Sequence, residues 1–158
     1  MDSSKKQEYT LKITNANKTQ LIVIIFDMAL DYITEANEAF SLKDKKLYIQ
    51  SVDHAQKCVE SLLSGLDLEY ELSHSLWHLY FYINKKLSEA IKYYKTEPLQ
   101  EAEKLLSKLK SSFEEISKQD TSAPLMGNTQ SVVAGMTYGK NSLTENLQNN
   151  GNSRGYFA

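Results

Sequence analysis

The residues of this sequence best suited to chemistry are three histidines and the acidic residues near them. His74 and His78 are four positions apart, a spacing that places both on one face of a helix, where they could share a metal ion. Zinc would need a third or fourth ligand. Glu71 and His74 form a single Glu-x-x-His element, whereas a di-iron helical bundle needs two. A metal-binding helical-bundle enzyme centred on Glu71, His74 and His78 is therefore kept as an alternative to a solvated or partly packed histidine pair.

Other catalytic patterns are missing from the sequence. There is no Gly-x-Ser-x-Gly element, no glycine-rich phosphate loop and no Cys-x-x-Cys pair. The single cysteine, Cys58, falls on the apolar face of an expected helix and is interpreted as a small core residue. We therefore expect a protein that is not an enzyme, with no catalytic residues, no bound metal and no cofactor.

Composition and charge narrow the class of partner. The chain has 158 residues, a formal net charge of -2 and one arginine, Arg154, so neither bulk charge nor arginine content favours a nucleic-acid partner. The first ten residues lack the apolar core of a signal peptide, and the apolar run Leu21–Phe26 is too short to span a bilayer. These features predict a cytoplasmic protein with no membrane insertion.

The elements that would position these residues are helices. Between Gln20 and Phe40, apolar residues recur every three or four positions, and Asn17 with Gln20 forms a capping-box pattern at the start. The same period predicts helices over Lys45–Ser64, Glu69–Tyr94 and about 98–118, and Gly65 is expected to end the helix Lys45–Ser64 in the left-handed conformation. Four long amphipathic helices with short loops predict an all-α fold, an antiparallel up-down four-helix bundle over residues 17–118.

Two segments flank the expected bundle. In residues 1–16, Tyr9, Leu11 and Ile13 alternate, as in an extended segment that lays one side on a surface. Residues 119–158 hold five of the six glycines and few charges, which predicts a low-complexity tail, either flexible or docked. The tail carries spaced apolar residues that could dock in a groove: Val132, Val133, Met136, Tyr138, Leu143, Leu147, Tyr156 and Phe157.

Two of the expected helices carry more apolar residues than one buried stripe needs. The surplus comprises Leu21, Ile24 and Met28 in the first helix and Trp77, Tyr80, Phe81 and Tyr82 in the third. If both faces reach the surface, they form a groove suited to an amphipathic helix or an extended peptide. The same residues could instead pack a thick core or form the interface of a structural homodimer, so all three interpretations stay open.

A family resemblance adds to this pattern. The chain from about Tyr9 to Lys118 resembles the FliS family of flagellin export chaperones. Four stretches carry the likeness, with further leucines in the fourth helix: Ile25-Phe26-Asp27-Met28-Ala29, Ala55-Gln56 followed by Val59 and Leu62, Leu66-Asp67, and Leu79-Tyr80-Phe81-Tyr82-Ile83. Met28 stands where the family has a small residue, and Lys18-Thr19 stand where the family has a proline-led helix start.

The resemblance implies a cytoplasmic chaperone that binds the disordered C-terminal segment of flagellin in an apolar groove and prevents its premature polymerisation. The residues that we expect to bind this client are Leu21, Ile24, Ile25, Trp77, Tyr80 and Tyr82. In such proteins an N-terminal stretch with a tyrosine can cover the groove when no client is bound, and Tyr9, Leu11 and Ile13 match that role here.

Overall fold

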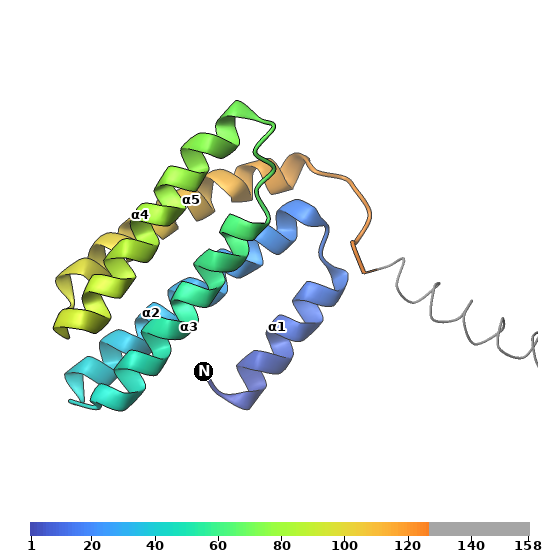
Figure 1. Ribbon diagram of the computed structural model, residues 1–158. Coiled ribbons are helices and arrows are strands. Elements are labelled where there is room, and N and C mark those ends of the chain that lie inside the picture. Colours follow the sequence, from blue (N-terminus) through green and yellow to red (C-terminus); the bar gives the residue numbers. More distant parts are fainter. Residues whose placement is uncertain (127–158) are drawn as a thin grey trace, which may run out of the picture.

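The computed structural model describes residues 1–126, which form five helices and no strand (Figure 1). The helices are α1 (Ser3–Asn15), α2 (Lys18–Ser41), α3 (Lys45–Ser64), α4 (Glu71–Tyr93) and α5 (Glu97–Gln119). The expectation of an all-helical protein is confirmed for this part of the chain. The expected tail lies largely outside the described residues.

Short polar side chains set where three of the helices begin. Asp2 accepts a hydrogen bond from the backbone N–H of Lys5 at the start of α1, and Asp44 accepts one from Leu47 at the start of α3. Asn17 and Gln20 bond reciprocally at the start of α2, so the capping box predicted from the sequence is present. Each cap satisfies a backbone N–H that has no partner within its helix.

Two local expectations were wrong. Residues 3–15 form a helix rather than an extended segment. Tyr9 and Ile13, four positions apart, turn toward α2, whereas Leu11 between them is 66% exposed. The helical spacing of Tyr9 and Ile13 was therefore the informative signal. Gly65 does follow α3, but at φ -85° it is not left-handed; among residues 1–126, Lys43 and Tyr94 are the residues with a left-handed backbone.

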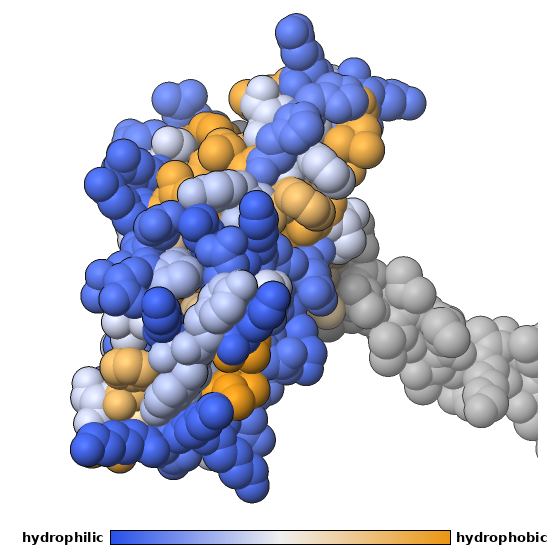
Figure 2. Space-filling view, turned by 60° about the vertical axis from the view of Figure 1, so that its left-hand side comes forward, coloured by the Kyte–Doolittle hydropathy of each residue, from blue (hydrophilic) through white to orange (hydrophobic). Residues whose placement is uncertain are grey.

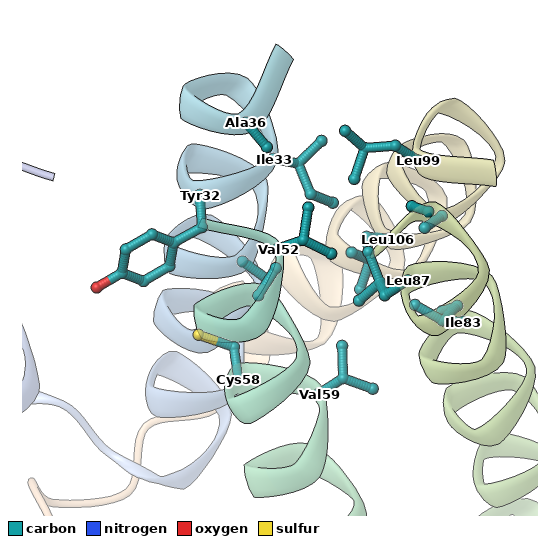
Figure 3. Packing of buried hydrophobic residues seen from close by; sticks show 14 of the residues in the cluster. Tyr32, Ile33, Ala36, Val52, Cys58, Val59, Ile83, Leu87, Leu99 and Leu106 are labelled. Atoms are coloured by element: carbon teal, nitrogen blue, oxygen red, sulfur yellow. The ribbon is translucent and has the colours of Figure 1, made fainter. Parts of the chain in front are cut away.

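Helices α2, α3, α4 and α5 share one core. Helix α2 packs against α3 and α5, and α4 packs against the same two helices. Figure 3 shows Ile33, Val52, Leu87, Leu99 and Leu106 converging from all four helices, and each of these side chains is completely buried. Burial of that apolar surface is the main term that stabilises the fold.

One buried tyrosine fixes the turn between α4 and α5. The Tyr48 hydroxyl, carried by α3, donates to the carbonyl oxygen of Lys95 at 2.7 Å. Its ring packs against the rings of Phe40 and Tyr94, with centroids 5.7 and 5.1 Å away. Burial raises the pKa of Tyr48 to about 12. The hydroxyl therefore stays protonated and remains a hydrogen-bond donor at neutral pH.

Helix α1 stands apart from this core. In Figure 1 it lies on the side of α2 and α3 away from α4 and α5, and its packing is against α2. Tyr9, Ala16 and Ile24 form a second small buried cluster between α1 and α2. No helix within residues 1–126 combines the length and the apolar character that crossing a bilayer would require.

Candidate functional site: an apolar groove

An apolar pocket opens at the end of the molecule where α2 and α4 begin. Its volume is about 510 Å³, and residues from α2 to α5 and Leu125 line it. We call it the end pocket; its apolar lining includes Leu21, Ile22, Ile25, Leu66, Leu76 and Tyr80. Tyr80 is 1% exposed and forms the inner part of this lining. A concave apolar surface of this kind favours an apolar ligand over a charged one.

A second pocket continues from the first between α1, α2 and α3. It has a volume of about 350 Å³, and Ile13, Met28, Tyr32 and Cys58 line it together with Leu21 and Ile25. We call it the side pocket. Because Leu21 and Ile25 line both pockets, the two form one groove along α2, and α1 borders its side-pocket part.

The side pocket contains two titratable groups that burial keeps neutral. Cys58 is 8% exposed, and burial raises the pKa of its thiol to about 11. Burial also raises the pKa of the Tyr32 hydroxyl, whose ring stacks on His54 with centroids 4.8 Å apart. Figure 3 shows Tyr32 and Cys58 directed away from the converging core residues. Tyr32 and Cys58 therefore contribute neutral groups rather than a reactive centre to a pocket wall that also includes His54 and Lys57.

Polar contacts hold α1 against α2. The Tyr9 hydroxyl donates a hydrogen bond to the carboxylate of Asp31, and the Lys5 ammonium lies 2.8 Å from the same carboxylate. Burial and the hydrogen bond to Asp31 raise the pKa of Tyr9, so its proton is retained. The amino group of Met1 pairs with Glu35. Burial disfavours the charge of Glu35, but bonds from the Met1 amine and from Ser51 outweigh that effect and lower its pKa.

Exposed apolar side chains concentrate beside the end pocket. Seven large ones lie within residues 68–82, on the α3–α4 linker and the first half of α4: Leu68, Tyr70, Leu72, Trp77, Leu79, Phe81 and Tyr82. Figure 2 shows one group of orange, apolar side chains in the upper part of the view, the height at which α4 begins in Figure 1, and further orange side chains lower down. Exposed large apolar side chains gathered in one short stretch are typical of binding surfaces, so this stretch is a candidate part of the site.

The structure separates the six predicted client-binding residues into three groups. Leu21, Ile25 and Tyr80 line the end pocket. Ile24 lies under α1, in the cluster with Tyr9. Trp77 and Tyr82 lie outside both pockets and are 38% and 41% exposed; the Trp77 ring stacks on Phe81, whereas the Tyr82 hydroxyl bonds to Glu101 of α5.

The three predicted cap residues also differ in position. Tyr9 is buried against α2, and Ile13 lines the side pocket. Leu11 borders a separate, more open hollow between α1, α2 and the end of α5. Sequence reasoning missed Asp31 as the partner of Tyr9; its acidic side chain lies 22 positions along the chain, too far for a local pattern to reveal.

The residues of the metal-binding alternative and Asp27, a member of the family motif in α2, lie on helices that share the main core. Glu71, His74 and His78 are exposed on α4, and within residues 1–126 no three His, Cys, Asp or Glu side chains lie close enough together to hold a metal ion. Asp27 pairs with Lys110 of α5 at 2.5 Å, and this contact raises the pKa of the lysine. Asp27 therefore joins α2 to α5.

After α5 the chain turns back over the junction between α1 and α2. The Asn17 side-chain amide donates to the carbonyl oxygens of Asp120 and Ser122, both at 3.3 Å. The Leu125 N–H donates to the carbonyl oxygen of Ala16 at 2.9 Å. Sequence reasoning found Asn17 as a helix cap but not this second role, because the partners are more than one hundred positions away.

Comparison with known proteins identifies the family. No curated protein matches the chain. A family model described as "Flagellar protein FliS" matches residues 1–120, which include all five helices. Because that match covers well over half of the sequence, it confirms the resemblance drawn from the four sequence stretches, and the chain belongs to the FliS family of flagellar chaperones.

Proposed function

We propose that this protein is a cytoplasmic export chaperone that binds the disordered C-terminal segment of flagellin in the groove and prevents premature polymerisation. The observation that carries the proposal is the groove itself, in which Leu21 and Ile25 line two adjoining pockets. A disordered client loses chain entropy when it binds, so it must bury a large apolar area in return. The exposed side chains of residues 68–82 extend that area beyond the pockets.

In this proposal each part of the chain has a separate task. Residues 17–118 form an antiparallel up-down four-helix bundle that presents the groove. Residues 1–16 cap it in the free protein, because α1 covers Ile24 and borders the side pocket. Residues 119–158 form the tail. The client-contacting residues proposed are Leu21, Ile24, Ile25, Trp77, Tyr80 and Tyr82; those that α1 covers or that lie in the core become accessible only after local rearrangement.

Calorimetric titration with the C-terminal ~40 residues of a flagellin from the same source tests this function, since that length can wrap helices of roughly 30 Å. We expect binding with a large negative heat-capacity change. Leu21→Ser should weaken binding by roughly 10-fold or more, because a buried leucine contributes about 1.5–3 kcal/mol. Leu42→Ser is the matched control, since Leu42 is 79% exposed in the α2–α3 turn and lines neither pocket.

Two results would contradict the proposal. One is an absence of binding by the full chain and also by a Tyr9→Ala variant in which α1 is loosened. The other is equal weakening by Leu21→Ser and Leu42→Ser, which would mean that the groove is not the binding surface. A second possibility is that a homodimer interface occupies the groove. Sedimentation of the free protein across a concentration series tests it, because such a homodimer would dissociate on dilution or on addition of the peptide.

A further inference from the structure

The end pocket has a wall that the chain supplies after its last helix. Leu125 lines this pocket although it follows α5, and it is 51% exposed, so it borders the mouth rather than filling the interior. Its backbone N–H bonds to Ala16 at 2.9 Å. The chain beyond Met126 therefore starts at the mouth of an apolar pocket.

Several hydrogen bonds fix that starting position. Thr19 donates to the Asp120 carboxylate at 2.5 Å, and the Ser122 N–H donates to the same carboxylate at 2.9 Å. The Ser122 hydroxyl also donates to this carboxylate, at 2.5 Å. The Ser122 hydroxyl, followed by Thr19 and the Ser122 N–H, lowers the pKa of Asp120 to about 2, so the carboxylate is charged at neutral pH and accepts all three hydrogen bonds. Together with the Asn17 amide, they hold residues 120–125 on the junction between α1 and α2.

Residues 127–158 follow this point, and their low charge and spaced apolar residues suit an apolar pocket. Residues 127–158 contain three charged side chains, Lys140, Glu145 and Arg154. Val132, Val133 and Met136 come seven to eleven positions after Leu125. Seven residues can extend to roughly 23 Å, which is enough to cross a pocket of about 510 Å³.

We propose that the chain's own C-terminal segment occupies the end pocket, with Val132, Val133 and Met136 as its apolar contacts. A short tether gives an attached segment an effective concentration in the millimolar range, so weak apolar contacts are enough for occupancy. Resting on the function proposed above, the segment competes with the client for Leu21, Ile25 and Leu76. If it fills the pocket nine-tenths of the time, the apparent client affinity falls about tenfold.

Cross-linking in the full chain tests the occupancy without any client. In a Cys58→Ser background, Ser73→Cys places a thiol on the pocket wall and Val133→Cys places one on the segment. The control pairs Val133→Cys with Ser88→Cys, which is exposed on the same helix and outside the end pocket. We expect an intramolecular disulfide to form at least tenfold faster in the first pair. Equal rates would overturn the proposal.

Client binding supplies a second test in which Cys58 is unchanged. Val132→Ser, Val133→Ser and Met136→Ser combined in the full chain should tighten flagellin-peptide binding about tenfold. Gln130→Ser with Thr137→Ser is the matched control, since it changes polar residues of the same stretch. Equal affinity of both variants would overturn the competition. If cross-linking is selective but no variant binds the flagellin peptide, the docked segment is supported and the proposed function is refuted.

Discussion

The hydrogen bond from Tyr9 to Asp31 allows a quantitative prediction about the closure of α1. Tyr9→Phe removes the hydroxyl and preserves the buried ring. A hydrogen bond to a charged group contributes about 1.5–3 kcal/mol. The Asp31 side chain is 26% exposed and keeps its ion pair with Lys5, so water and the lysine compensate for part of the lost hydrogen bond. The lower figure, about 1.5 kcal/mol, therefore applies and corresponds to roughly a tenfold larger open population of α1.

Hydrogen exchange followed by NMR or mass spectrometry measures that population. Amides in the middle of α1 should exchange about tenfold faster in Tyr9→Phe, whereas amides of α3 should keep their rates, because α1 packs against α2 outside the main core. Thr10→Val is the control; it removes an exposed hydroxyl that bonds only to Lys6 within the same helix. Unchanged exchange in α1, or an equal rise in α3, would refute the idea that this bond holds α1 in place.

Three further predictions concern the core, the thiol and the turn after α5. Leu87→Ala should lower the free energy of unfolding by about 2–5 kcal/mol in denaturant titration, whereas Leu72→Ala, 69% exposed on the same helix, should change it by less than about 0.5 kcal/mol. At pH 8 the Cys58 thiol should react with a thiol reagent roughly 100-fold more slowly when folded than when unfolded, because burial raises its pKa from 9.0 to about 11. Carbon-13 NMR titration of Asp120 should give a pKa of about 2, and Ser122→Ala should raise it toward the ordinary 3.8, because Ser122 supplies the leading hydrogen bond. Since folding lowers this pKa, the stabilisation from the charged carboxylate is complete above pH 3.8 and disappears as the pH falls through about 2.

Local signals explain what the sequence predicted well. The start of α2 could be predicted because Asn17 and Gln20 bond within one turn, and the long helices could be predicted because their apolar residues repeat with the helical period. Helix α1 was missed because it is short and mostly polar, with only Tyr9 buried. Its stability comes from α2 rather than from its own residues, as is common for short helices.

The candidate site was less predictable because it depends on contacts between distant residues. Trp77 and Tyr80 are both aromatic and lie three positions apart on α4, and the sequence placed both in the apolar surplus. In the structure Tyr80 faces the core, whereas Trp77 faces the surface. Leu125 lies in a stretch without a periodic apolar pattern, so its place beside Ala16 is known only from the fold. Sequence periodicity predicts which face of a helix is apolar but does not show which later segment will cover it.

The bonds between Asn17 and residues 120–122 also have a consequence for the order of events during synthesis. Asn17 leaves the ribosome about a hundred residues before its partners Asp120 and Ser122. At translation rates of about 5–20 residues per second, that interval lasts roughly 5–20 s. During this time α1 and α2 can form, but their junction lacks the clamp that α5 and the following turn provide. The junction therefore becomes fixed only after residues 120–125 have left the ribosome, so a nascent chain and a finished one differ at the junction between α1 and α2.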